Sequence, residues 1–195
     1  MEIEIKIKLA DAKSLYNASG SDVRKALEQL FGAEAFEFNY RDIKSFDDAC
    51  RHLGISTEIP AKRACVDYCD EAAEQAAATY MLIVICKALC NGKYTDENGF
   101  SWFPWYWLYS KEELANMSKE ELKEKGIQLL SACSAFYAGH AGVRYAHANY
   151  RGAHTYAYCG FPLCANSKEM AMYLDEQFRD LIYQCYGIKV KQEND

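Results

Sequence analysis

The sequence predicts an α+β fold, with helices packed on a small antiparallel sheet around one core. Two observations lead to this class. Helical patterns fill the first half of the chain, where residues 64–90 form one long, mostly apolar segment. Residues 127–163 then alternate small and aromatic side chains between glycines, as antiparallel strands do, before a last helical pattern at 167–186. Runs of helix and runs of strand that follow one another are typical of α+β folds.

The first part of the chain, residues 1–62, predicts an N-terminal lobe of short helices. Charged and apolar residues alternate over 1–9, which indicates a short strand or an extended arm. Gly32 and Gly54 are suited to end helices, and Ser45 is suited to cap one. The expected helices cover residues 9–16, 22–31 and 46–53, with Ser21 as the cap of the second helix and a linker at 33–44.

Residues 63–188 predict the α+β body, which we expect to fold as one unit with the lobe. Asn91 and Gly92 stop the long central helix, and Asn166 with Glu169 forms a capping box at the start of the last helix. The central and C-terminal helices are expected to pack together on the sheet. Ser110 is expected to cap a polar helical stretch at 111–125, and the tail at 189–195 is expected to be flexible.

An aromatic segment before the polar stretch is the main candidate for binding. Seven of the ten residues from Phe100 to Tyr109 are aromatic, more than one face of a strand can bury. Two interpretations stay open: the segment packs wholly into the core, or it packs partly and also forms a contact surface for a protein, a base or another ring. The candidate binding residues are Phe100, Trp102, Trp105, Trp107 and Tyr109, joined by Tyr145 and Tyr156 from the sheet.

Composition narrows the choice of partner and compartment. The formal net charge of −6 disfavours binding to duplex nucleic acid, which needs clustered Lys and Arg. No export signal is visible, and the uncharged stretch at 76–86 is shorter than the roughly 20 apolar residues that a membrane helix needs. The nine cysteines are therefore expected to be reduced and mostly buried. We expect a cytoplasmic protein with no membrane anchor.

Three histidines at seven-residue intervals, His140, His147 and His154, are the only weak metal candidates. Zinc needs three or four ligands that converge on one point, whereas an odd separation along a strand sends successive side chains to opposite faces. Hydrogen-bonding residues at strand ends are the preferred interpretation. The sequence contains no Walker loop, dinucleotide fingerprint, zinc-protease motif or nucleophile elbow. We therefore predict no cofactor and no enzyme.

Several short motifs follow one another in an order that is known from a protein family. Residues 43–50 are Ile-Lys-Ser-Phe-Asp-Asp-Ala-Cys, and Trp-Phe-Pro-Trp follows at 102–105. Leu163 and Cys164 then lead into Ser-Lys-Glu at 167–169. In this order the motifs resemble uncharacterised proteins of tailed bacteriophages and prophages of gut bacteria, crAss-like phages among them. The family implies a phage setting in the host-cell cytoplasm or in the virion, and it implies no catalytic residues.

These observations favour a phage-associated accessory protein that acts by protein–protein contact, as a virion or host-takeover component. Its partner is another protein or a second copy of the chain, bound by the aromatic segment and the tyrosine-rich sheet. The first alternative is a protein that binds a small ligand or single-stranded nucleic acid with the same rings. The second alternative is a thiol- or metal-dependent enzyme built on the three histidines and a neighbouring cysteine.

Overall fold

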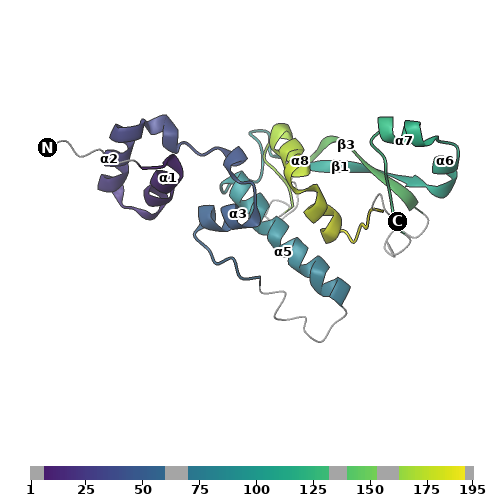
Figure 1. Ribbon diagram of the computed structural model, residues 1–195. Coiled ribbons are helices and arrows are strands. Elements are labelled where there is room, and N and C mark those ends of the chain that lie inside the picture. The colour runs from purple at the N-terminus through teal and green to yellow at the C-terminus, as the bar shows by residue number, and fades with distance from the viewer. Residues whose placement is uncertain (1–6, 60–69, 132–139, 153–162, 192–195) are drawn as a thin grey trace. The chain divides into compact units, whose positions relative to one another are not determined.

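The computed structural model describes residues 7–59, 70–131, 140–152 and 163–191 (Figure 1). Helices and a three-stranded antiparallel sheet make up these residues, which confirms the predicted α+β class. By its internal contacts the chain divides into two compact units, Met1–Asn39 and Tyr40–Asp195. Each unit is described by itself.

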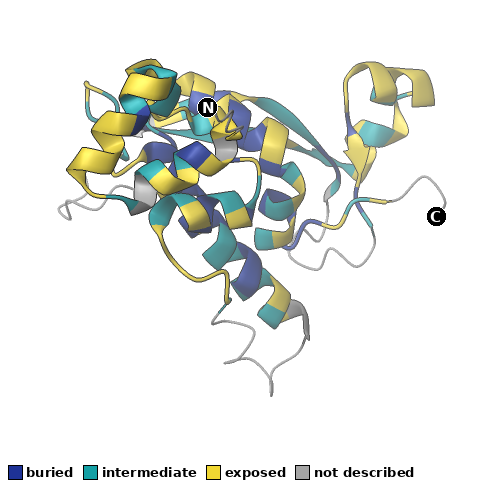
Figure 2. Ribbon diagram, turned by 60° about the vertical axis from the view of Figure 1, so that its left-hand side comes forward, coloured by how far each residue is buried: buried dark blue, intermediate teal, exposed yellow. Residues whose placement is uncertain are grey.

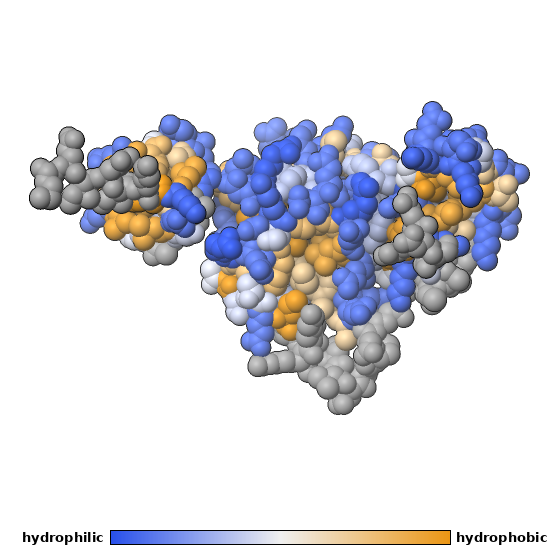
Figure 3. Space-filling model, in the orientation of Figure 1, coloured by the Kyte–Doolittle hydropathy of each residue, from blue (hydrophilic) through white to orange (hydrophobic). Residues whose placement is uncertain are grey.

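The first unit contains the helices α1 (Leu9–Ala18) and α2 (Ser21–Phe31) and the 3-10 helix η1 (Ala33–Phe36). Tyr16 connects all three, because its ring stacks on Phe36 at 4.4 Å and its hydroxyl donates to Glu28 at 2.5 Å. Only Ala12 and Leu27 are buried among the described residues of the unit. Figure 3 shows apolar surface on this small unit, and its exposed apolar side chains include Leu9, Leu15, Val23 and Leu30.

The second unit is built around α5 (Asp70–Cys90), which ends where the predicted central helix was expected to end. The earlier part of the predicted helix, residues 64–69, lies outside the described residues. Helix α5 packs against α3 (Phe46–Leu53) and α8 (Lys168–Cys185), and the core between them includes Ile85, Leu89 and Leu174. The 3-10 helix η2 (Tyr40–Asp42) lies beside α5. Within the described residues, Ala72–Cys90 is the one helical window long and apolar enough to cross a membrane, and 50% of it is buried inside the protein.

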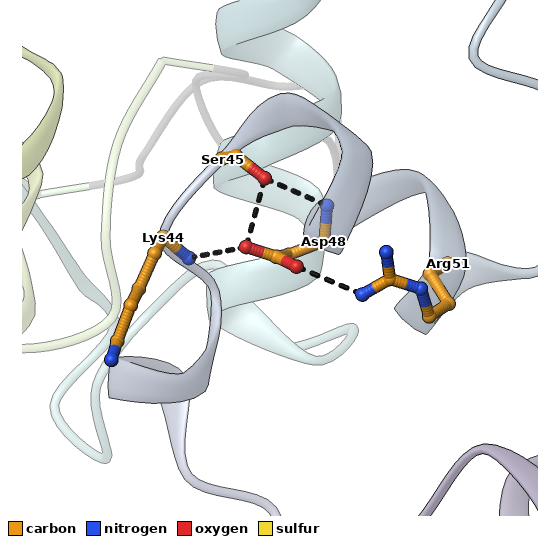
Figure 4. A network of polar contacts seen from close by, with 4 residues as sticks. All are labelled: Lys44, Ser45, Asp48 and Arg51. Carbon is orange, nitrogen blue, oxygen red and sulfur yellow. Dashed lines mark hydrogen bonds and ion pairs between the residues drawn. The ribbon is translucent and has the colours of Figure 1, made fainter. Parts of the chain in front are cut away.

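Helix α3 starts with the cap that its sequence predicts (Figure 4). The Ser45 hydroxyl accepts a hydrogen bond from the Asp48 backbone N–H at 3.1 Å, which satisfies a free donor of the first turn. The Asp48 carboxylate in turn accepts from the Ser45 hydroxyl, the Lys44 backbone N–H and Arg51. These three donors outweigh the effect of burial and hold the pKa of Asp48 below its usual value. Gly54 ends the helix in the left-handed conformation, at φ 66°.

The sheet has the strand order β1–β3–β2, with β1 at Phe100–Ser110, β2 at Gln128–Leu129 and β3 at His140–Gly152. Both pairs are antiparallel. The register shifts between Trp105 and Tyr106, which lie opposite His147 and Tyr145, so Ala146 is an extra residue in β3. Pro104 lies in a strand at the end of this order, where a missing N–H is tolerated.

Two short polar helices follow β1, α6 (Lys111–Ala115) and α7 (Lys119–Glu124). Each begins with a capping box, formed by Ser110 with Glu113 and by Ser118 with Glu121. The predicted cap at Ser110 is therefore confirmed, and Figure 2 shows that most of both helices is exposed.

Helix α8 carries the main correction to the expected caps. Ser167, and not Asn166, is its N-cap, because the Ser167 hydroxyl accepts from the Met170 N–H at 3.1 Å. Asn and Ser are both good capping residues, so sequence alone did not separate two neighbours. The helix bends at Phe178, whose φ of −127° and ψ of 21° are not helical.

Candidate binding face of the sheet

The register of β1 on β3 assigns the aromatic segment to two faces of the sheet. Residues directly opposite each other in an antiparallel pair share a face, and neighbours along a strand alternate. Trp102 is opposite Tyr150 and Tyr106 is opposite Tyr145; we call their side the inner face, because α8 packs against it. The other side, which we call the outer face, carries Phe103, Trp105 and Trp107 from β1 and Arg144, His147 and Asn149 from β3.

The inner face packs Trp102 and Tyr106 against the core, whereas Tyr150 at the same end of the sheet is 50% exposed. Trp102 packs against the main core cluster, and its indole Nε1–H donates to Asp96 at 3.0 Å. Asp96 also accepts from the Phe100 backbone N–H, and these bonds lower the pKa of the Asp96 carboxyl. Tyr150 contacts the rings of Phe100 and Trp102, at centroid distances of 4.9 Å for each. This end of β1 is therefore held by packing as well as by the sheet.

A buried polar cluster joins the inner face to α8. The Tyr106 hydroxyl donates to Asp175 at 2.5 Å, and Arg179 donates to both carboxylate oxygens of Asp175. Asp175 is only 1% exposed. Tyr106 forms edge-to-face contacts with Tyr145 and Tyr183. Both carboxylate oxygens of Asp175 therefore have hydrogen-bond partners, as a buried carboxylate requires.

The electrostatics of this cluster keep its tyrosines protonated. Burial raises the pKa of Tyr106, and its hydrogen bond to Asp175 raises it further. Burial also raises the pKa of Tyr145, and it raises that of Tyr183 to about 12. The hydrogen bond to Asp175 raises the pKa of Arg179. Tyrosines whose pKa is raised in this way stay protonated near neutral pH and give up their proton poorly. The cluster is therefore suited to hold β1 against α8 and not to transfer protons.

The outer face presents rings to solvent. Trp107 is 50% exposed, and Phe103 and Trp105 are half-buried. The Phe103 and Trp105 rings lie 6.2 Å apart, as expected for neighbours at i and i+2 on one face of a strand. Side chains of Leu114 and Ile127 approach this face at Gly142, so one end of it is covered and Trp107 lies towards that end. The three rings form a row along one strand.

The strands of the sheet carry basic side chains and no acidic ones. No Asp or Glu occurs in β1, β2 or β3, although the chain has 28 acidic residues. Arg144 lies opposite Trp107, and the exposed His147 lies opposite Trp105. The Nε of Arg144 is buried and has no hydrogen-bond partner among the described residues. A cation beside exposed rings is an arrangement that favours an anionic, partly aromatic ligand.

The residues that were predicted from the sequence to form one binding set do not all lie on the same face of the sheet. Trp105 and Trp107 come together on the outer face, whereas Trp102 and Tyr145 lie on the inner face. Phe100 is half-buried against Tyr150. Tyr109 is opposite Gly142, at the covered end, and Tyr156 lies outside the described residues. Phe103 and Arg144 were not among the binding residues predicted from the sequence. Two signals in the sequence pointed to them: the alternation of side chains along β1 and the lack of acidic residues in the strands.

The histidines and cysteines that the structure describes do not form a metal centre. His147 is exposed on the outer face, His140 is opposite Ser110, and His154 lies outside the described residues. Among the residues that the structure describes, no group of three or more His, Cys, Asp or Glu side chains is arranged to hold a metal ion. The histidine set therefore stays an untested candidate.

The five described cysteines are free thiols, and all but the half-buried Cys185 are buried. Cys90 donates to the Cys164 carbonyl at 3.4 Å. Burial raises the pKa of Cys90 to about 12, with a further contribution from Cys164, and burial raises that of Cys86 as well. Thiols with raised pKa are poor nucleophiles, so these cysteines act as core residues.

One open depression of about 340 Å³ lies between the start of α5 and the end of α8. Its lining combines the acidic Glu74 and Asp180 with Lys189 and the Tyr183 ring. Gln75 approaches Gly187 so closely that a Cβ there would clash with the Gln75 Nε2. The depression is shallow and of mixed charge, and it contains no group with the chemistry of a specific ligand.

Comparison with protein-family models, curated proteins and solved structures gives no match to the chain. The fold and the candidate face therefore rest on the residues described above.

Proposed function

We propose that this protein is a binding protein that recognises another protein through the outer face of its sheet. The observation that carries the proposal is Trp107, a tryptophan 50% exposed on a strand that is paired with β3. A large ring left in water loses the free energy that burial would supply, about 25 cal/mol for each Å² covered. Trp105 and Phe103 extend this surface along the same strand.

The composition of the outer face is that of an interface centre. Trp, Tyr and Arg are enriched at residues that dominate protein–protein binding, whereas acidic side chains are depleted there. The outer face holds two tryptophans and Arg144, and the strands that form it hold no carboxylate. The strand fixes these side chains before binding, so little further ordering is needed when a partner covers them.

A second candidate function is the binding of single-stranded nucleic acid, which the row of rings favours. Bases stack on aromatic side chains, and each stacked base contributes about 1–3 kcal/mol. The formal net charge of −6 opposes a polyanion, however, and Arg144 is the one arginine whose side chain is described on the outer face. The charge therefore favours a protein partner. The resemblance to phage proteins supports a virion or host-takeover setting for that contact.

A selection of random linear peptides on the purified full chain tests the proposal. We expect wild type to enrich a set of related peptides, and Trp107→Ser to lose their binding. Met172→Ala is the matched control, because Met172 is also an exposed apolar side chain but lies on α8, against the other face of the sheet. Enrichment that survives Trp107→Ser, or that is lost equally in Met172→Ala, contradicts the proposed face.

A further inference from the structure

The charges of the outer face identify the kind of partner that it fits. We infer that the partner segment is acidic and that one of its carboxylates pairs with Arg144, next to the ring of Trp107. This inference rests on the proposed function and adds the chemistry of the partner to it.

The first support is the distribution of charge in the chain. The protein is acidic, with 28 Asp and Glu against 22 Lys and Arg, yet its three strands contain no acidic residue. Arg144 and His147 supply a cationic and a titratable side chain there. A negative partner meets no like charge from the strands, and the rest of the acidic surface disfavours contact elsewhere.

The second support is the state of the Arg144 side chain. Its Nε is buried without a hydrogen-bond partner, and it forms no ion pair with a described carboxylate. Arg51 and Arg179, by contrast, each pair with a carboxylate on their own helix. The terminal nitrogens of the Arg144 guanidinium are not among the buried unpartnered atoms, so they are the donors that a carboxylate from a partner can reach.

The third support is the geometry around Arg144. A guanidinium offers several donors in one plane, which match the two oxygens of a carboxylate. Arg144 is directly opposite Trp107, so an acidic side chain that reaches the guanidinium brings its neighbours onto the exposed ring. His147, opposite Trp105, supplies a second exposed donor on the same strand. An acidic segment with apolar or aromatic neighbours satisfies both features.

The count of charges favours a protein carboxylate over a phosphate chain. A nucleic acid presents one charge per nucleotide, and its affinity depends on several Lys and Arg that neutralise phosphates. Against a protein of net charge −6, a single half-buried guanidinium balances one carboxylate and leaves most phosphates of a polyanion unpaired. The same argument predicts that added salt weakens the peptide complex only moderately.

The test compares the peptides selected by wild type with those selected by Arg144→Gln. We expect wild type to enrich Asp and Glu next to aromatic residues, and Arg144→Gln to lose that preference. A synthetic wild-type peptide should bind Arg144→Gln about tenfold more weakly or worse, which corresponds to about 1.4 kcal/mol. Changing the acidic residue of the peptide to its amide should cost as much with wild type and almost nothing with Arg144→Gln.

The outcomes separate this inference from the proposed function. Selected peptides that bind through Trp107 but show no acidic preference overturn the inference and leave the function standing. An absence of any peptide, together with Trp107-dependent binding of an oligothymidylate monitored by tryptophan fluorescence, overturns both. Arg144→Glu gives an independent check, because it should select Lys- and Arg-containing peptides if the pair exists. Folding of both variants is verified by thermal unfolding, since removal of the unpaired Nε should leave stability unchanged or higher.

Discussion

The hydroxyl of Tyr106 donates a hydrogen bond of 2.5 Å to the buried carboxylate of Asp175, and this bond joins β1 to α8. Arg179, one turn further along α8, donates to the same carboxylate and balances its charge. The polar cluster lies under the sheet on its inner face, so the side of β1 that faces α8 is fixed. The side that faces away, with Trp105 and Trp107, is thereby held in place for binding.

Tyr106 and Tyr145 offer a matched pair of hydroxyl deletions. Their rings are in edge-to-face contact on the inner face, at a centroid distance of 5.9 Å. The Tyr106 hydroxyl bonds to Asp175, whereas the buried Tyr145 hydroxyl has no partner among the described residues. Hydrogen bonds to charged groups contribute about 1.5–3 kcal/mol, so Tyr106→Phe should lower the free energy of unfolding by that amount. Tyr145→Phe should be neutral or stabilising.

Urea unfolding followed by circular dichroism measures both variants. Equal losses of stability in Tyr106→Phe and Tyr145→Phe would show that ring packing, and not the bond to Asp175, connects α8 to the sheet. Since neither substitution changes the ring volume, a difference between them reports on the hydroxyl alone.

Ser45 should contribute to stability through the cap of α3. Its hydroxyl accepts from the Asp48 N–H and donates to the Asp48 carboxylate. Loss of such a cap typically costs about 1 kcal/mol, so Ser45→Ala should lower the unfolding midpoint accordingly. Ser21→Ala is the control, because Gly20, and not the predicted Ser21, is the N-cap of α2, and the Ser21 hydroxyl donates to its neighbour Asp22. A loss in Ser21→Ala as large as in Ser45→Ala contradicts this account.

The buried cysteines should resist alkylation in the native protein. Burial raises the pKa of Cys86 and of Cys164, and it raises that of Cys90 to about 12, so little thiolate forms near neutral pH. We expect iodoacetamide at about pH 8 to modify these three thiols only after denaturation, as shown by peptide mass spectrometry. The half-buried Cys185 should react first among the described cysteines. Rapid alkylation of Cys90 in the native protein would show that this thiol is not buried as described.

Much of the fold followed from local patterns in the sequence. The caps at Ser45 and Ser110 and the stops at Gly54 and Asn91-Gly92 were predictable, because each depends on a few neighbouring residues. The sheet was predicted only in part: β3 lies within the expected strand region, but it runs through Gly142, which was expected to be a turn, and its partner β1 comes from the aromatic segment outside that region. The caps and stops depend on short-range chemistry that a single sequence contains.

The candidate site was less predictable, because it depends on register. Which rings of the aromatic segment face α8 is decided by the pairing of β1 with β3, and the extra Ala146 changes the alternation before His147. The bond from Tyr106 to Asp175 joins residues 69 positions apart, which no local pattern reveals. One hint was available: Asp175 lies beside Leu174 and three residues before Phe178, on the apolar side of the last helix.

Tyr183 should make the protein less stable in alkali. Its hydroxyl donates to Gln128, and burial raises its folded-state pKa to about 12, above the ordinary value of 10.0. Because the folded pKa is the higher one, this contribution to stability is complete below about pH 10 and is lost as pH rises towards 12. Each unit of difference is worth about 1.4 kcal/mol, so the wild type should lose about 1–3 kcal/mol more than Tyr183→Phe over that range. Urea midpoints of both proteins at a series of alkaline pH values measure the difference, and parallel curves for the two would show that Tyr183 ionises as easily when folded as when unfolded.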